Sequence, residues 1–302
     1  MKIHGIVVAC FKDDLFLLRS CVASIRYWYP NVDIFLLKDV IKGEFSTSEL
    51  EKYWNVKIFP TNRRAFGWPW SKLETFLSEE PARVLFLDSD VVFLGPVLDV
   101  LSADDADFVV TGILEPDQRS DNLNANYMDM TMMKEFDPEY QYPGFAFNTG
   151  QMVVTSGLLD ESDLSSVIDC GKTFKSKYPK MLKYADQGAL NYVLGKAAAA
   201  GKITLSYRDF WLWPRMKAAL DFDISLLQNR TGIPVILHWA GAKPVDFRKY
   251  IRFDILSFYN DFYYSRIPAG RVKRAARYAG QLSIVLLKLL KYKMLRMDYA
   301  KI

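Results

Sequence analysis

The chain has 302 residues, of which half are apolar and a quarter are charged. This composition supports one large folded core with at most an appendage, and it argues against a disordered chain. Three cysteines without metal-site spacing argue against a disulfide framework and favour a reducing, cytoplasmic compartment. The apolar run at the start is too short for a signal peptide, so we expect a first buried strand there.

The net charge of +4 is unevenly distributed along the chain. Residues 266–302 contain ten Lys or Arg and one acidic residue, which gives +9, so the preceding residues carry −5. A basic tail on an acidic body predicts an acidic partner surface for the tail, either a membrane or a nucleic acid.

The first half of the chain alternates strand-like and helix-like patterns. Strands are predicted at residues 3–9, 33–37, 56–59 and 83–87. Helices are predicted at residues 15–29, 46–54 and 72–79, with Ser46 and Glu49 fitting a capping box. The alternation predicts an α/β fold with a largely parallel sheet, in which ligands bind beyond the carboxyl ends of the strands.

The second half is less regular. Residues 117–143 are polar and show no period, which predicts either a loop over a site or an acceptor-binding insertion. Further along, the patterns predict strands at 147–155 and 235–237, helices at 158–178 and 186–194, and an aromatic segment at 245–264 that packs on the body.

The basic tail has two parts, a cationic cluster at 271–277 and an apolar run at 282–297. Lys288, Lys291, Lys293 and Arg296 interrupt that run, whereas a membrane-spanning helix needs roughly 20 apolar residues. We therefore expect a domain at 1–265 followed by an appendage at 266–302. The appendage is interpreted as an interfacial helix that contacts an anionic membrane through 271–298, peripheral to the inner face. A helix that packs on the body or on a second subunit is the alternative.

Asp88 and Asp90 directly follow the apolar strand predicted at 83–87. Two carboxylates separated by one residue point the same way on an extended chain, and a divalent cation relieves their repulsion. Carboxylate oxygens suit Mg²⁺ or Mn²⁺, which also bind phosphate oxygens. The pair therefore predicts a metal site, with a solvated surface turn as the alternative.

His238 ends another apolar strand, in the sequence LHWAGAKP. Imidazole suits Mn²⁺ as a third ligand, Gly241 permits close approach of a phosphate to the backbone, and Lys243 can neutralise that phosphate. A core histidine bonded to the backbone is the alternative interpretation.

Two further groups of polar residues are candidates for binding a ligand. Lys72, Arg63 and Arg64 precede the Asp88 strand and are candidates to meet donor phosphates, or else are ordinary exposed bases. Asn148 in FNTG, and Asp186 with Gln187 in ADQGALN, offer the donors and acceptors that sugar hydroxyls need. Asp186 has a second interpretation as the cap of the helix that it precedes.

Five blocks of the chain together resemble the conserved blocks of glycosyltransferase family 8, the group that contains glycogenin and bacterial lipopolysaccharide galactosyl- and glucosyltransferases. In order they are SKLETF, LFLDSDVVF, FNTGQMVV, DQGALN and HWAGAKP. The resemblance runs from about residue 3 to residue 244. Three features depart from the family pattern: one residue fewer between His238 and Lys243, Val245 in place of a tryptophan, and the opening ACFKDD.

The resemblance implies a Rossmann-like GT-A fold and a metal-dependent enzyme that moves a hexose from a UDP-sugar to a hydroxyl of a saccharide or glycolipid, with retention. It implies Mn²⁺, or Mg²⁺, held by Asp88, Asp90 and His238. The residues expected around the donor are Ser89 at the ribose; Lys72, Gly241 and Lys243 at the diphosphate; Asn148, Asp186 and Gln187 at the sugar; Arg63 nearby; and Val8, Cys10 and Phe16 around uridine. Lys72, Asp186 and Gln187 are the expected catalytic residues. No pair of carboxylates is identified as the nucleophile and acid of a double displacement, and Asp186 is the nearest candidate for the nucleophile.

Three other functions are compatible with parts of the pattern. A haloacid dehalogenase-type phosphohydrolase would use Asp88 as its nucleophile, but its motif normally opens the domain, whereas three predicted strands precede Asp88 here. A non-catalytic protein would bind a nucleotide-sugar or a membrane on the same fold. Nucleic-acid binding would use the tail, whose apolar residues favour lipid instead.

Overall fold

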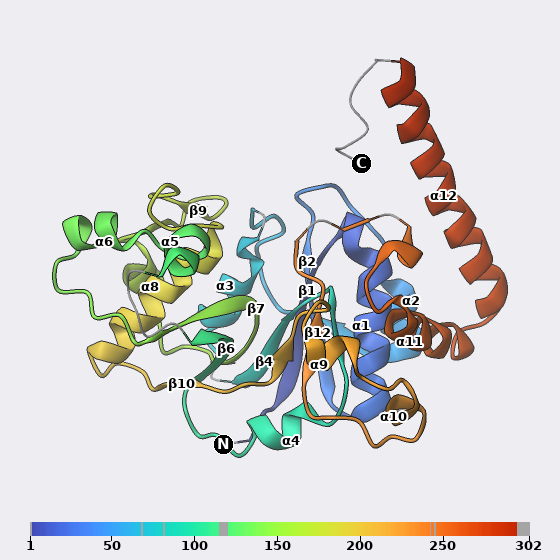
Figure 1. Cartoon of the computed structure of the whole chain (residues 1–302), viewed down its shortest axis with the longest axis horizontal. Helices are drawn as coiled ribbons and strands as arrows, with labels where there is room; N and C mark the ends of the chain where they lie inside the picture. Colours follow the sequence, from blue (N-terminus) through green and yellow to red (C-terminus); the bar gives the residue numbers. More distant parts are fainter. Residues whose placement is uncertain are drawn as a thin grey trace.

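The structure is a computed structural model in which a central sheet lies between two groups of helices (Figure 1). It describes every residue except Met1, Trp68, Pro81, 115–119, Ala242, Val245 and 295–302. Val245, one of the positions that differ from the family pattern, and the part of the expected tail helix that contains Arg296 therefore lie outside the described residues.

The central sheet has seven strands in the order β10-β6-β7-β4-β1-β2-β3. The strands are β1 (Gly5–Phe11), β2 (Asp33–Asp39), β3 (Val56–Ile58), β4 (Arg83–Asp88), β6 (Phe108–Leu114), β7 (Phe145–Thr155) and β10 (Leu205–Tyr207). β1 pairs in parallel with β2 and β4, β2 with β3, and β6 with β10, whereas β7 runs antiparallel between β4 and β6. The prediction of a mostly parallel α/β sheet is confirmed.

Both faces of the sheet are covered, which explains why β1 is apolar without interruption. Ile6 and Val8 belong to one core, and Val7 and Ala9 belong to the other. The first core includes residues of α1 (Leu15–Trp28), α2 (Ser48–Trp54) and α11 (Phe253–Ser265). The second includes residues of α3 (Leu73–Phe76), α5 (Asp121–Asn126), α6 (Met130–Phe136) and α8 (Asp186–Ala199), on the other side in Figure 1. A strand buried on both faces has no polar side from which alternation could arise.

A second sheet of three strands lies beside the first, in the order β11-β12-β5. It consists of β11 (Trp211–Leu212), β12 (Ile236–His238) and β5 (Val91–Phe93). β12 runs antiparallel to β5, with His238 opposite Val91. Because Val91 follows Asp90 directly, this register carries His238 to the end of β4.

The segment predicted as one helix at 158–178 is mostly not helical, so that prediction is wrong. It forms a short α7 (Glu161–Leu164) and a hairpin of β8 (Ile168–Asp169) and β9 (Lys175–Ser176). Asp160 caps α7 with a capping box, and Arg63 donates to the carbonyl of Gly171 at 2.6 Å. These tertiary bonds fix a turn where the apolar spacing alone fitted a helix.

The polar segment at 117–143 contains two short helices, α5 and α6, in its described part. Ser120 caps α5, and Asp129 caps α6. The remaining short helices are α4 (Val97–Leu101), α9 (Lys217–Leu220) and α10 (Ser225–Gln228). As expected, the aromatic segment that contains α11 packs on α1 and contributes Tyr259 and Tyr263 to the core.

The tail forms α12 (Gly270–Met294), whose first half packs on α11. The rest of the helix extends away from the body (Figure 1). Glu49 joins the tail to the domain, because it accepts hydrogen bonds from Arg277 at 2.8 and 3.0 Å, from Lys273 at 3.0 Å and from Tyr263 at 2.7 Å. The capping box predicted for Ser46 and Glu49 is therefore wrong. Over the described residues, no helix combines the length and the hydropathy that a membrane crossing needs.

The attachment of α12 should depend on pH through Glu49. Burial raises the pKa of Glu49, but the bonds from Arg277, Tyr263 and Lys273 outweigh burial and lower that pKa from 4.5 to about 2. Because the folded-state pKa is depressed, the stabilisation is complete above about pH 4.5 and is lost as the pH falls towards 2. The difference in unfolding free energy between the wild type and Glu49→Gln should therefore shrink across that window. A difference that stays constant over the window would contradict the assignment, and Glu135→Gln, at an exposed glutamate of α6, is the control.

Candidate functional site

Three residues meet where the two sheets adjoin. Asp88 ends β4, Asp90 lies in the turn before β5, and His238 ends β12. One ligand atom from each of the three lies within 4.8 Å of the other two. The sequence offered these residues as a metal set, and the structure brings them together from segments about 150 positions apart.

The surroundings of these three residues fit a divalent cation. Asp90 Oδ1 is buried and has no hydrogen-bond partner among the described residues; His238 Nε2 lies 3.3 Å from it. Gly150 on β7 lines the group closely, since a Cβ there would collide with the His238 ring and lie 2.8 Å from Asp88 Oδ2. Two carboxylates and an imidazole are ligands that Mn²⁺ accepts. A buried oxygen without a partner is the kind of atom that a cation would satisfy.

Lys243 lies on one side of the carboxylates. Its Nζ is 2.6 Å from Asp14 Oδ2 and 3.1 Å from Asp90 Oδ2. Burial alone would lower the pKa of Lys243, but Asp90 and Asp14 outweigh burial and raise that pKa. Burial alone would raise the pKa of Asp90, but Lys243 and His238 hold it below its ordinary value. Both groups are therefore charged at neutral pH.

Lys72 lies on the other side and is fully buried. Its Nζ is 2.6 Å from Asp186 Oδ2, 3.8 Å from Asp88 Oδ1 and 2.9 Å from the carbonyl of Thr149, to which it donates. Burial opposes the charge of Lys72, but Asp186 and Asp88 outweigh burial and raise its pKa. Asp186 Oδ2 also accepts from the Thr149 hydroxyl at 2.5 Å. The interpretation of Asp186 as a helix cap is wrong, because α8 has no side-chain cap.

Asn148 and Gln187 connect β7 with α8 beside this cluster. Asn148 Nδ2 donates to Gln187 Oε1 at 3.1 Å, and Gln187 Nε2 donates to the carbonyl of Asn126 at 2.9 Å. Asn191, one turn further along α8, bonds both backbone groups of Phe147. The amides are therefore held in place by neighbours on rigid elements.

The other residues expected around the sugar donor lie at strand ends, in the core, in a loop and on α1. Ser89 and Cys10 are buried near each other at the ends of β4 and β1. Val8 is fully buried in the core. Gly241 has a φ of +99°, in the left-handed region that favours glycine, and its Cβ position is open. Phe16 packs edge-on against the rings of Phe247 and Tyr250.

Arg63 is engaged away from the carboxylates. Its Nε lies 2.8 Å from Glu74 Oε1, and its guanidinium stacks over the ring of Phe174. Arg64 pairs with Glu44. The sequence analysis did not identify Asp14, Thr149 or Gly150 as members of the site. The only local signal at these positions was that each lies within a few residues of a strand end or of a residue already proposed for the site.

The model of the family described as Glycosyl transferase family 8 matches residues 71–244, which is more than half of the chain. The chain belongs to glycosyltransferase family 8. The matched range contains Lys72, Asp88, Asp90, His238 and Lys243. The chain is accordingly a glycosyltransferase, and the phosphohydrolase and non-catalytic alternatives are wrong.

Solved structures of glycosyltransferases share the fold of this family 8 chain. The galactosyltransferase LgtC, solved with donor and acceptor sugar analogues, is 17% identical with a TM-score of 0.53, over 87% of this chain and 97% of that one. The bifunctional enzyme WbbM is 13% identical with a TM-score of 0.55, over 87% of this chain and 50% of that one. GlyE of Streptococcus pneumoniae TIGR4 is 14% identical with a TM-score of 0.52, over 85% of this chain and 60% of that one. At these identities the likeness shows the GT-A fold alone. No curated protein sequence matches the chain.

Replacing Gly150 by alanine should damage the candidate metal site of this family 8 enzyme without changing any charge. The added Cβ would meet the His238 ring and Asp88, so one ligand must move. We expect the affinity for Mn²⁺, measured by calorimetry, to fall about 10- to 100-fold. Gly280→Ala, where the Cβ would meet open space, is the matched control. Unchanged affinity in Gly150→Ala would show that Gly150 does not shape a cation site.

Proposed function

We propose that the enzyme transfers a hexose from a UDP-sugar to a hydroxyl of a saccharide or glycolipid, with retention and with dependence on Mn²⁺ or Mg²⁺. The observation that carries the proposal is the grouping of Asp88, Asp90 and His238 at the strand ends, with the buried Lys72 on one side and the partly buried Lys243 on the other. Family membership supplies the reaction class, a nucleotide-sugar donor and a sugar acceptor.

The site is built to stabilise a departing diphosphate. Asp88, Asp90 and His238 would hold the cation, whose Lewis acidity lowers the cost of the negative charge that develops on a diphosphate leaving group. Lys243 adds a fixed positive charge at the same edge, from the side of Asp14. Both charges are set before the donor arrives, so little reorganisation is needed during the reaction.

Asn148 and Gln187 are proposed to bind the hydroxyls of the transferred sugar. Asp186 Oδ2 is occupied by Lys72 and by the Thr149 hydroxyl, which disfavours Asp186 as a covalent nucleophile. A front-face transfer fits this arrangement better. In it the acceptor hydroxyl attacks on the side from which the diphosphate leaves, and the departing phosphate takes the proton.

Trp213 is proposed as an acceptor platform. It directly follows Leu212, the last residue of β11, which pairs with Leu237, the residue before His238. Trp213 is 46% exposed, although Trp211, two residues before it, is buried. An exposed indole at the end of the strand that pairs with β12 offers an apolar face on which a sugar ring can stack.

The tail is proposed to contact an anionic membrane surface through 271–298. The described part of α12 carries basic side chains together with exposed leucines at 286, 287 and 290. Such a helix lies in the headgroup region of a bilayer, as a lipid-linked acceptor would require.

Replacement of Asp90 by asparagine should abolish metal-dependent transfer while leaving the fold intact, because the site loses a charged ligand. A screen of nucleotide-sugars with and without Mn²⁺ measures turnover, and NMR of the product measures the anomeric configuration. Asp221→Asn, at an exposed aspartate that pairs with Lys217, is the control. Wild-type turnover in Asp90→Asn would overturn the metal assignment, and an inverted product would overturn retention.

Replacement of Trp213 by alanine should raise the KM for the acceptor about fivefold, since one stacking face is worth about 1 kcal/mol. The affinity for the donor should not change, and Trp213→Phe should retain most of the acceptor affinity. A change in donor affinity alone would place Trp213 in the donor site instead.

A further inference from the structure

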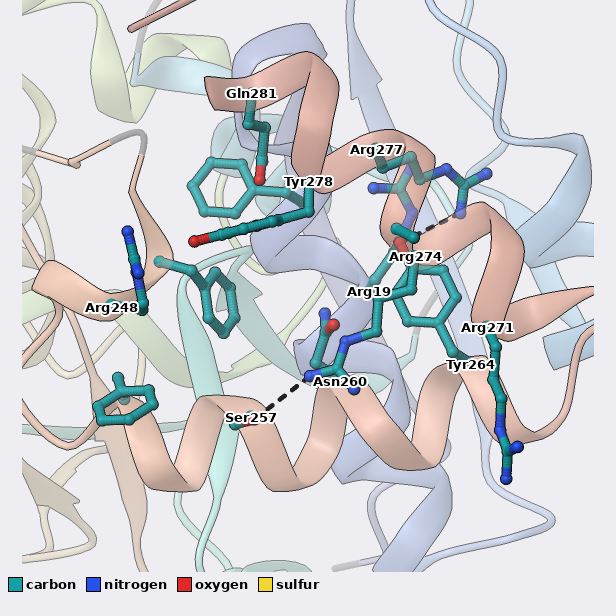
Figure 2. Close-up of a pocket in the computed structure, with 14 residues that line it drawn as sticks. Arg19, Arg248, Ser257, Asn260, Tyr264, Arg271, Arg274, Arg277, Tyr278 and Gln281 are labelled. Carbon is teal, nitrogen blue, oxygen red and sulfur yellow. Dashed lines mark hydrogen bonds between the residues drawn. The ribbon is translucent and has the colours of Figure 1, made fainter. Parts of the chain in front are cut away.

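A second pocket, of about 560 Å³, opens between α11, the first half of α12 and the start of α1 (Figure 2). Its volume falls within the range of about 300–1,000 Å³ that is typical of small-ligand sites. Five arginines line it: Arg19, Arg248, Arg271, Arg274 and Arg277. None of its lining residues is acidic, and the lining does not include Asp88, Asp90 or His238.

The positive charge of this pocket is only partly neutralised. Three of the arginines pair with acids outside the lining: Arg248 with Asp246, Arg274 with Asp261, and Arg277 with Glu49. Arg19 and Arg271 have no ion-pair partner among the described residues. Arg19 is half-buried on α1, so water hydrates its guanidinium incompletely. A half-buried cation without a counter-charge is stabilised by a bound anion.

The chemistry of the lining selects the kind of anion. A guanidinium presents its donors as a planar fork, which matches two oxygens of a phosphate. Ser257 and Asn260 of α11 add neutral polar groups (Figure 2), and Ser257 Oγ accepts from Arg274 Nη2 at 3.4 Å. Phe16 and Phe247 form an apolar wall beside them. A phosphate ester attached to an apolar or neutral group fits such a lining better than a free ion does.

The helix that forms one wall of the pocket also carries apolar side chains beyond it. Gln281 is the last residue of α12 in the lining. Leu286, Leu287 and Leu290 follow on the part that leaves the body, and they are 60%, 66% and 56% exposed. Exposed leucines next to a basic pocket that holds a phosphate ester match an amphiphile, which presents a phosphate and hydrocarbon side by side.

We propose that this pocket binds the phosphate of an acidic phospholipid headgroup, with the leucines of α12 in contact with the surrounding lipid. Such binding depends on the particular residues that line the pocket, whereas diffuse (non-specific) electrostatic attraction would depend only on the net charge of the tail. The site is separate from the donor site, and it does not depend on the transfer reaction.

Calorimetry of the full chain with a short-chain phosphatidylglycerol, kept monomeric, tests the pocket directly. The wild type should bind it, and Arg19→Gln and Arg271→Gln should each weaken binding about tenfold, through loss of a charge-assisted bond. Lys249→Gln is the matched control, because Lys249 is an exposed base next to Arg248 in the chain but does not line the pocket. Arg271 is exposed, so its replacement keeps the test valid if Arg19→Gln fails to fold.

Two results would overturn the proposal. Equal weakening by Lys249→Gln and by the pocket variants would show diffuse attraction, and inorganic phosphate that binds as tightly as the short-chain lipid would show a free-phosphate site. Sedimentation with vesicles gives a second measure. Phosphatidylglycerol vesicles should bind more protein than vesicles of equal charge that carry a fatty-acid carboxylate, and Arg19→Gln should remove that preference.

Discussion

Crowding of like charges at one edge of the sheet is the constraint on which the rest of the structure depends. Four carboxylates, of Asp14, Asp88, Asp90 and Asp186, collect there, and among the described residues Lys72 and Lys243 are the cations that pair with them. Buried like charges repel strongly, and burial raises the cost of each charged form. The arrangement is stable because each lysine is shared between two carboxylates, and the site is suited to a cation because Asp90 Oδ1 has no hydrogen-bond partner among the described residues.

The groups around these carboxylates come from distant segments of the chain and meet where the strands end. Lys72 precedes α3, and Asp186 begins α8, yet both meet at Thr149 in the antiparallel strand β7. His238 arrives through the pairing of β12 with β5. A glycine at 150 leaves room for the imidazole and for Asp88. The candidate site is thus an outcome of strand register as much as of residue type.

In the basic tail the arrangement is reversed, because one acidic residue binds several basic residues. Glu49 binds Arg277 and Lys273 of α12 and Tyr263 of α11, and so fixes the first half of the tail helix on the domain. The neighbouring arginines then face a pocket that contains no acid. A transferase site and a surface for anionic lipid would therefore lie on one rigid body, joined by α1, whose first turn contributes Phe16 to the pocket and follows directly on Asp14.

The sequence by itself determined the α/β class and the parallel half of the sheet, and it singled out Asp88, Asp90 and His238, because these depend on short local patterns: apolar runs, strand-terminal carboxylates and a strand-terminal histidine. Only the tertiary structure decided which groups neutralise one another. Asp14 and Thr149 give no periodic signal, and they matter because folding brings them to Lys243 and Lys72. Residues 158–178 have helical spacing but form a short helix and a hairpin, since bonds from distant segments, Arg63 to the carbonyl of Gly171 and Phe174 N to the carbonyl of Phe66, outweigh a weak local preference. Glu49 fits a capping box in sequence, yet arginine and lysine of the tail provide charge-assisted bonds that a helix cap cannot match.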